Sequence, residues 1–386
     1  MQVSIEVPVF KGRFLRPCVD SVLAQTSDAW TLSLYWNGGD EQSRTILERL
    51  QHEGDARVRV FFGENRGIAG GRKLLTDHSE GDYILPLDDD DILCPRAVER
   101  FLQVATGCPW ASLIRARRVL IDVEGNIVEQ EPWFPFGPRS YDRGMVTDIF
   151  NQSQPYLIRR SAYNRTRGWT GFPDFMGAGE DCDIFLQLEE VAHFEFIDEV
   201  LYEYRLHDGR ASLSLTNAAA FEMWRRLCDG AITRIGLPLK RVNDTPPFVY
   251  ERLPRRPVTL EDVNVVTRGT DGASTWRMAG FRATQRPVVC FLGEHADIQT
   301  FIRTLNDTGA DLLAPSPGGK ILLVRREVVA ATGGFDEQYV PASSQAADFW
   351  IQARRRGFSC VGIPPEGDLG ALRSKWRSHT NLLPSS

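Results

Sequence analysis

The N-terminal part of the chain alternates between two hydrophobic periods, and this alternation constrains the fold more than any other feature of the sequence. In one set of segments, apolar side chains recur at every second position or run almost without interruption, which is typical of β-strands. In the segments between them, apolar side chains recur at helical spacing. The strand-like segments are 3–9, 30–36, 58–62 and 83–87, and the helix-like segments are 15–23, 46–50 and 73–78. Strands that alternate with helices predict a parallel sheet covered by helices on both faces.

Ligands bind such sheets outside the carboxyl ends of the strands. The loops that follow the predicted strands are therefore the first places to look for functional residues. These loops are Phe10–Arg13, Asn37–Asp40, Gly63–Gly71 and Asp88–Asp91.

Consecutive carboxylates, Asp88–Asp91, directly follow the predicted strand 83–87. Like charges this close repel one another and raise each other's pKa, so the cluster is costly unless a cation neutralises it. Mg²⁺ or Mn²⁺ does so when it binds one or two carboxylates together with phosphate oxygens. A solvated Asp-rich turn is the alternative, and Asp91 itself is predicted to cap the helix that follows Pro95.

Composition narrows the class of protein. The formal net charge of −6 argues against a protein that coats nucleic acid. No apolar run approaches the roughly 18–20 residues that span a bilayer, and the N-terminus has no basic and apolar leader. The 7 cysteines are scattered singly, which supports neither a disulfide framework nor a zinc site. These features favour a cytoplasmic protein.

The chain of 386 residues is too long for one ordinary core. Beyond residue 110 the pattern predicts a hairpin over 119–128, a helix after Glu180-Asp181 and an amphipathic helix over 217–235. The Pro-rich, basic stretch after this helix indicates a domain boundary. The predicted parts are a first domain at 1–235, a linker at 236–257 and a second domain at 258–386.

A set of short motifs occurs in order along residues 1–215. They are Val3-Ser4-Ile5 with Pro8, Ser21 with Gln25-Thr26, Asn65-Arg66-Gly67 with Arg72, Gly81-Asp82-Tyr83 with Leu87 to Asp91 and Pro95, Arg159-Arg160, Gly168-Trp169, Gly179-Glu180-Asp181, and Tyr204-Arg205-Leu206-His207. Together they resemble the N-terminal half of family 2 glycosyltransferases. The resemblance implies an α/β fold of the GT-A type, which is Rossmann-like with a mostly parallel sheet covered by helices.

The resemblance also implies roles for particular residues. The nucleotide-sugar donor would contact Pro8, Phe10, Asn37, Asp40, Arg72, Asp88 and Asp89. A divalent cation, Mn²⁺ or Mg²⁺, would be held by Asp90 and Asp88, with His207 close to it. Asp181 would be the catalytic base, with Glu180 beside it. The sequence departs from the family at Lys11, where Asn is usual, and in residues 36–40, which lack the usual paired Asp.

The implied reaction transfers a sugar from a nucleotide-diphosphate donor, above all a UDP-sugar, to a hydroxyl of a saccharide or glycoconjugate. A cation stabilises the charge that builds on the departing diphosphate, and a carboxylate takes the proton of the attacking hydroxyl. Direct displacement inverts the anomeric centre. The residues alone leave other readings open: a nucleotidyltransferase, a non-catalytic nucleotide-sugar-binding scaffold, and a purely capping role for Glu180-Asp181 at a helix start.

The predicted linker is rich in basic residues, which are Lys240, Arg241, Arg252, Arg255 and Arg256. They would suit peripheral contact with anionic lipids at the inner face of the membrane. A solvated linker is the simpler explanation. Formation of a homo-oligomer is also left open.

Several segments of 258–386 match segments of the first domain in order and spacing. The matched pairs are Arg72 with Arg277, 83–87 with 288–292, Arg159-Arg160 with Arg325-Arg326, Gly168 with Gly334, and 183–187 with 348–352. In this alignment Gly293–Ala296 replace Asp88–Asp91, and Gln345-Ala346 replace Glu180-Asp181. We therefore predict a smaller GT-A-like α/β domain that lacks the first two strands, is catalytically inactive, and serves acceptor binding, dimerisation or packing. Chance similarity among short apolar segments is the alternative.

Overall fold

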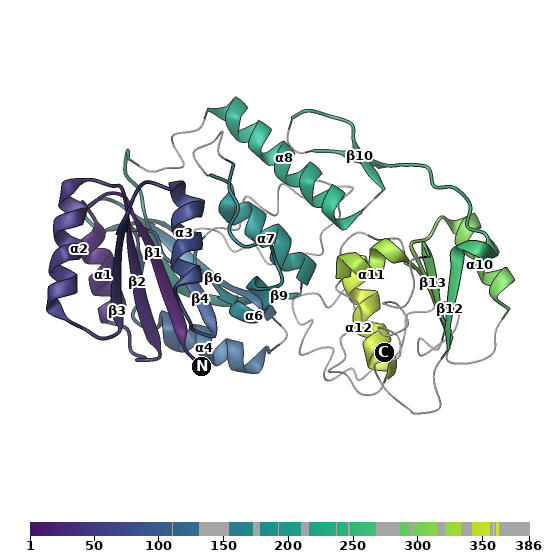
Figure 1. Cartoon of the computed structure of the whole chain (residues 1–386), viewed down its shortest axis with the longest axis horizontal. Helices are drawn as coiled ribbons and strands as arrows, with labels where there is room; N and C mark the ends of the chain where they lie inside the picture. The colour runs from purple at the N-terminus through teal and green to yellow at the C-terminus, as the bar shows by residue number, and fades with distance from the viewer. Residues whose placement is uncertain are drawn as a thin grey trace. The chain divides into compact units, whose positions relative to one another are not determined.

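The computed structural model of the chain describes residues 1–109, 111–130, 154–172, 178–191, 193–209, 216–236, 238–245, 248–267, 286–292, 297–314, 321–332, 342–355, 358 and 360–362. These residues form two compact units, of which unit 1 ends at Leu227 and unit 2 begins at Cys228. The division falls within one long helix, α8 (Asn217–Ile235). The amphipathic pattern predicts this helix, but the sequence places the domain boundary after it. Each unit has a sheet of its own (Figure 1).

The sheet of unit 1 has a parallel part and a mixed part. Its strands, in spatial order, are β3 (Val58–Gly63), β2 (Trp30–Asn37), β1 (Val3–Val9), β4 (Tyr83–Pro86), β8 (Tyr156–Arg159), β6 (Ala111–Ile121), β9 (His193–Arg205) and β5 (Ile92–Leu93). The strands from β3 to β4 run parallel, β8 is antiparallel to both of its neighbours, and β6 is parallel to β9. The predicted hairpin is confirmed, since β7 (Ile127–Gln130) pairs antiparallel with β6. The carboxyl ends of β1, β2 and β4 therefore meet at one edge.

Helices cover both faces of this sheet. The helices α1 (Leu15–Leu23), α2 (Glu41–Glu53) and α4 (Ala97–Gly107) contribute apolar residues to a core on one face. Helix α3 (Gly67–Asp77) lies on the other side of the parallel strands (Figure 1). The helices α6 (Arg160–Tyr163) and α7 (Glu180–Val191) pack against β4, β6 and β8 in a second core. The α/β architecture predicted from the sequence is thus confirmed. In the described part of the chain, no helix has both the length and the apolar character needed to cross a bilayer.

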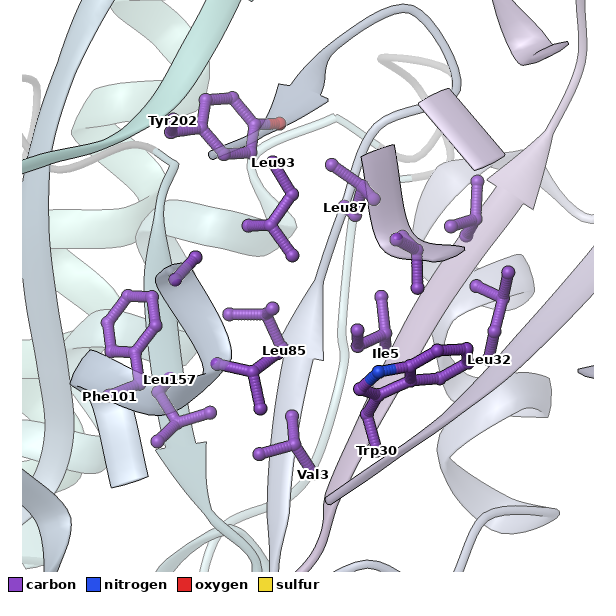
Figure 2. Packing of buried hydrophobic residues seen from close by; sticks show 14 of the residues in the cluster. Val3, Ile5, Trp30, Leu32, Leu85, Leu87, Leu93, Phe101, Leu157 and Tyr202 are labelled. Carbon is purple, nitrogen blue, oxygen red and sulfur yellow. The ribbon is translucent and has the colours of Figure 1, made fainter. Parts of the chain in front are cut away.

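The core beneath α1, α2 and α4 is built from side chains that lie opposite one another on neighbouring strands. Ile5 of β1 is in register with Leu32 of β2 and with Leu85 of β4, and all are buried. Val3 and Trp30 form a second such pair, and Figure 2 shows how these side chains pack. Burial of each apolar side chain of this size contributes about 1.5–3 kcal/mol to folding. A shift of one residue would turn the whole set to the other face, so this core fixes the register of the parallel strands.

The opposite face of β1 carries a buried carboxylate. Glu6 lies beneath α3 and accepts hydrogen bonds from Thr76 Oγ1 at 2.5 Å and from Ser79 Oγ at 2.6 Å. Burial raises the pKa of Glu6 to about 7. These hydrogen bonds join α3 to the strand beneath it.

Helix α3 begins earlier than the sequence predicts. The sequence predicts a loop over 63–71 and a short helix from Lys73, with the glycines of this segment as sites of close helix packing, yet the helix already begins at Gly67. A Cβ at Gly71 would lie 3.1 Å from Pro8 Cβ and 3.2 Å from Asn37 Nδ2, so glycine suits the close approach of the helix to the strands. The packing role predicted for the glycines fits this contact, whereas the loop prediction for 67–71 is wrong.

Unit 2 is a smaller α/β unit. Its strands, in spatial order, are β12 (Val263–Thr267), β13 (Val288–Leu292), β15 (Ile321–Arg325), β14 (Leu312–Ala314) and β16 (Cys360–Gly362). Its helices are α10 (Ile298–Thr308), α11 (Arg326–Thr332) and α12 (Ala342–Arg355), with a short 3-10 helix at Leu260–Asp262. Ile302 and Leu305 of α10 join a core with Val288, Cys290 and Leu323 of the sheet.

Residues 236–257, predicted as a linker, contain regular structure. The strands β10 (Leu239–Arg241) and β11 (Tyr250–Arg252) form an antiparallel pair. Tyr250 Oη donates a hydrogen bond to Asp229 of α8 at 2.9 Å, and Arg241 forms an ion pair with the same carboxylate at 3.2 Å. Arg255 forms an ion pair with Asp311 at 2.9 Å. These basic side chains contact acids of the protein itself, which weakens the case for lipid contact. The boundaries at 235 and 257 remain predictions.

Candidate active site

The acidic cluster Asp88–Asp91 lies among loops at the carboxyl edge of the sheet. Asp89 accepts hydrogen bonds from the backbone N–H groups of Phe10 at 2.7 Å and Lys11 at 3.0 Å, directly after β1. Lys11 Nζ donates in turn to the carbonyl of Gly209, beyond β9, at 3.1 Å. Burial is the main cause that raises the pKa of Asp89 to about 7. A freely solvated Asp-rich turn does not explain these contacts.

The segment after β9 holds the next residue of the cluster. His207 Nε2 lies 2.8 Å from Asp90 Oδ2, and the N–H of Gly209 donates to His207 Nδ1 at 3.1 Å. Because Nδ1 accepts a hydrogen bond, we assign the proton of the neutral imidazole to Nε2, which then donates to Asp90. The predicted association of His207 with the acidic cluster thus has a direct structural counterpart.

Asp91 does not cap a helix. It is fully buried and accepts hydrogen bonds from Tyr202 Oη at 2.8 Å and from the backbone N–H of Arg205 at 2.7 Å. Arg96 occupies the N-cap position of α4. The capping prediction is wrong because β9, which is distant in the sequence, supplies the donors that Asp91 needs.

Arg72 of α3 joins two acidic segments that lie far apart in the sequence. Its side chain is only 1 % exposed. Nη2 lies 2.7 Å from Asp88 Oδ1 and 3.8 Å from Asp181 Oδ1. Nε lies 3.3 Å from Glu180 Oε1. The predicted catalytic pair at the start of α7 and the acidic cluster after β4 therefore contact the same guanidinium.

The charges of this group oppose one another. Burial, followed by the charge of Asp181, raises the pKa of Glu180. Burial also raises the pKa of Asp181, and Asp88 acts in the same direction. The charge of Arg72 lowers the pKa of both acids. A buried carboxylate with a raised pKa, beside a specific cationic partner, is typical of a group that exchanges protons during a reaction.

Tyr156 of β8 completes this group, and no pattern in the sequence singles it out. Its hydroxyl donates a hydrogen bond to Asp181 Oδ1. Its ring packs edge-on against Phe185 of α7, with the ring centroids 4.8 Å apart. The signal that could have found it is its position in a short apolar strand just before Arg159-Arg160, but that position predicts only burial.

Two residues predicted to line the nucleotide pocket have structural contacts of their own. Asn37 is buried, its Nδ2 donates to the carbonyl of Gly67 at 3.0 Å, and its Oδ1 accepts from the N–H of Arg66 at 2.8 Å. Asp40 is the N-cap of α2 and accepts from the N–H of Ser43 at 2.7 Å. Both residues therefore fix the loops around the carboxyl edge, and their contact with a nucleotide stays a prediction.

Pro8 and Phe10 differ in accessibility. Pro8 is buried within β1 beneath α3, whereas Phe10 at the end of the strand is 46 % exposed. Of the two, Phe10 has the apolar surface on which a planar base could stack.

The side chains of these loops limit how a divalent cation could bind. Among the residues that the structure describes, no three His, Cys, Asp or Glu side chains converge so as to hold a metal ion. Asp88 is engaged by Arg72, whereas Asp90 and His207 lie together at 2.8 Å. Mg²⁺ and Mn²⁺ need only one or two protein ligands when phosphate oxygens and water supply the rest. Asp90 therefore fits a cation that arrives with a diphosphate, and His207, which donates to Asp90 through Nε2, would orient this carboxylate. His207 could itself bind the cation only after its proton moved from Nε2 to Nδ1, where the N–H of Gly209 donates now.

Comparison with known proteins gives the family of this part of the chain. Residues 4–166 match the model of the family described as Glycosyl transferase family 2. The N-terminal part of the chain thus matches family 2 glycosyltransferases, and its sheet, parallel from β3 to β4 and covered by helices on both faces, agrees with the α/β architecture that its motifs imply.

This chain matches only part of the length of two synthases among its curated relatives. A chondroitin synthase of Escherichia coli is 25 % identical over 258 residues, which cover 65 % of this chain and 36 % of the relative. A hyaluronan synthase of Pasteurella multocida is 26 % identical over 213 residues, which cover 55 % of this chain and 21 % of the relative. Among solved structures, S. aureus TarS 1–349 in complex with UDP-GlcNAc is similar with a TM-score of 0.48 and 14 % identity, over 60 % of this chain and 66 % of that fragment.

We predict that Arg72→Met strongly destabilises the protein. Methionine keeps much of the side-chain volume but leaves Glu180, whose side chain is 6 % exposed, without its cationic partner. Removing one member of a buried ion pair typically costs about 3–5 kcal/mol of the free energy of unfolding. Urea denaturation of the variant measures this loss.

Arg44→Met is the matched control, because Arg44 pairs with Glu48 on the surface of α2. An exposed pair of this kind contributes only about 0–1 kcal/mol. In the double variant Arg72→Met/Glu180→Gln, part of the lost stability should return. Equal effects of Arg72→Met and Arg44→Met would contradict the buried role of Arg72.

Proposed function

We propose that this protein transfers a sugar from a nucleoside diphosphate sugar to a hydroxyl group of an acceptor, with inversion at the anomeric carbon. The observation that carries the proposal is the position of Arg72, which lies 2.7 Å from Asp88 and 3.8 Å from Asp181. It brings the acidic loop, which suits a donor, next to a carboxylate that suits proton removal from an acceptor. The family 2 domain at residues 4–166 supports the same class of reaction.

Asp181 is the proposed base. In the described residues, the hydrogen bond from Tyr156 and the ion pair with Arg72 both go to Oδ1. Oδ2 is then the oxygen that would face the acceptor hydroxyl. Burial raises the pKa of Asp181, which makes the carboxylate a better proton acceptor than an ordinary surface aspartate.

The proposed step is a single displacement. The acceptor oxygen forms a bond to the anomeric carbon, and its proton goes to Asp181. The bond between that carbon and the diphosphate oxygen breaks, and its electron pair leaves with the nucleoside diphosphate. Attack from the face opposite the leaving group inverts the anomeric centre, so no covalent enzyme intermediate is needed.

The donor would bind at the carboxyl edge of β1 and β4. Phe10 offers an exposed ring, and Asp88 and Asp89 lie beside it in the acidic loop. We propose that Asp90 holds Mn²⁺ or Mg²⁺ together with the diphosphate, and that His207 orients the Asp90 carboxylate. The cation, when bound, would supply positive charge to the leaving group. The saccharide or glycoconjugate nature of the acceptor remains part of the proposal.

We predict that Asp181→Asn abolishes sugar transfer while the protein still binds nucleotide. Asparagine keeps the shape of the side chain but takes up no proton, and general-base catalysis is typically worth about 10²–10⁴-fold in rate. Release of UDP from a panel of UDP-sugars, with and without saccharide acceptors, measures turnover. Calorimetric titration with UDP measures binding.

Asp77→Asn, at a half-exposed ion pair of α3, serves as the control and should leave both readouts unchanged. Full turnover in Asp181→Asn would exclude Asp181 as the base. Nucleotide binding without turnover in the unaltered protein, across the panel, would favour a non-catalytic binding protein.

We predict that Tyr156→Phe shifts the acidic limb of the pH–rate profile to higher pH. The hydrogen bond from Tyr156 stabilises the ionised form and so lowers the pKa of Asp181. Without it this pKa rises further. Because the base must be ionised to work, activity is then lost at a higher pH as the solution is acidified.

Tyr35→Phe is the control, because the Tyr35 hydroxyl donates to the carbonyl of Glu64 and not to Asp181. The profile of this control should match that of the unaltered protein. An unchanged acidic limb in Tyr156→Phe would show that Tyr156 does not act on the base.

A further inference from the structure

The sheet of unit 2 repeats five strands of unit 1. In chain order the strands of unit 1 concerned are β1, β4, β6, β8 and β9, and those of unit 2 are β12, β13, β14, β15 and β16. In both sheets the spatial order is first, second, fourth, third, fifth. The directions also agree, since the successive pairs are parallel, antiparallel, antiparallel and parallel in both.

The helices occur at the same points of this order. One helix follows the second strand, α4 in unit 1 and α10 in unit 2. A helix begins directly after the fourth strand, α6 at Arg160 and α11 at Arg326. Another helix precedes the fifth strand, α7 in unit 1 and α12 in unit 2. Chance similarity of short apolar segments does not account for the shared order of strands and helices.

Polar contacts at the strand–helix junction are repeated as well. Arg159 Nε donates to the carbonyl of Ala111 at 2.9 Å, and Arg325 Nε donates to the carbonyl of Ala310 at 3.1 Å. Each arginine ends the fourth strand of its unit. The agreement therefore extends from topology to side-chain hydrogen bonds.

The helix before the fifth strand carries a second repeated contact. Gln187 Nε2 donates to Asp183 Oδ2 at 2.8 Å within α7, and Gln352 Nε2 donates to Asp348 Oδ2 at 2.7 Å within α12. The alignment of the two sequences pairs these residues with each other. Both helices thus have the same buried polar pair, which begins three residues after Glu180 in α7 and three residues after Gln345 in α12.

The stretch between the first two strands is much shorter in unit 2 than in unit 1. Residues 268–287 take the place of 10–82, which hold β2, β3 and the helices α1 to α3. Such a segment is too short for two strands and three helices of that size, and Arg277, which the alignment pairs with Arg72, lies outside the described residues. The structure also corrects one expectation: β12 takes the place of β1 in the sheet, so the strands without a counterpart among the described residues are β2 and β3 and not the first two.

The carboxylates of the candidate site are lost at the equivalent positions. Glu180 and Asp181 are replaced by Gln345 and Ala346, which are fully buried in α12. In the sequence, Asp88–Asp91 are replaced by Gly293–Ala296, which lie outside the described residues. Packing and junction contacts are therefore kept, while the charges that proton transfer and diphosphate binding require are not.

We infer that unit 2 is an inactive copy of the active-site half of unit 1, and that the chain has a single donor site. The inference rests on the proposed function for the location of that one site. The inference also predicts which carboxylate controls the binding of the nucleotide. Asp90 lies in the donor site of unit 1 and should control it. Glu294, the sole carboxylate in the segment of unit 2 that replaces Asp88–Asp91, should have no effect.

Calorimetric titration of the full chain with UDP and Mn²⁺ tests the inference. We expect one equivalent of UDP to bind. Asp90→Asn should weaken this binding by about tenfold or more, the loss expected for one charge-assisted contact. Glu294→Gln should change neither the stoichiometry nor the affinity.

Two equivalents of UDP, or one equivalent that is lost in Glu294→Gln and kept in Asp90→Asn, would overturn the inference and leave the proposed transfer reaction standing. No binding of UDP or of other nucleoside diphosphates would contradict the proposed function and the single-site inference together. The outcomes therefore separate a failure of this inference alone from a failure of both.

Discussion

The buried guanidinium of Arg72 is the interaction on which the candidate site depends. It holds Asp88, Glu180 and Asp181 around one positive charge, although they come from two segments that lie far apart in the chain. Removing such charges from water is costly, and apolar residues of similar volume would pack at lower cost. A role in the reaction therefore explains the presence of these buried charges better than a contribution to the stability of the fold does. Helix α3, fixed on β1 through Glu6, sets the position of this guanidinium.

A residue of this site could be predicted from the sequence where its own segment shows an unusual pattern, and not where its role depends on partners distant in the sequence. The Asp88–Asp91 cluster and the acidic start of α7 at Glu180 stand out in the sequence, because charges interrupt an apolar pattern there. The role of Asp91 and the contribution of Tyr156 could not be predicted, since their partners lie on β9 and α7 and only the folded sheet brings them close. The glycines of α3 were predicted to allow close packing, but the start of the helix at Gly67 was missed, because the neighbours that require this close approach, Pro8 and Asn37, lie on the strands β1 and β2.

The two units show which constraints persist when a fold is kept without its chemistry. Strand order, the arginine that ends the fourth strand and the buried Asp–Gln pair of the following helix are common to both. These features satisfy buried polar groups or fix strand register, so losing them would destabilise either unit. The adjacent carboxylates Glu180 and Asp181 repel each other, and Gln345 and Ala346, which take their place in unit 2, carry no such charges. The sequence comparison predicted this division between packing and charge, and the sheet topology gives it a physical basis.

A crystal structure of the protein with Mn²⁺ and UDP would test the central claim most directly. The account predicts electron density for the diphosphate beside Asp90, with Arg72 still between Asp88 and Asp181 and with the Asp181 carboxylate facing the same space. Nucleotide bound in unit 2, or a diphosphate placed where Asp181 cannot reach an acceptor next to it, would contradict the claim that the carboxylates around Arg72 form the site of sugar transfer.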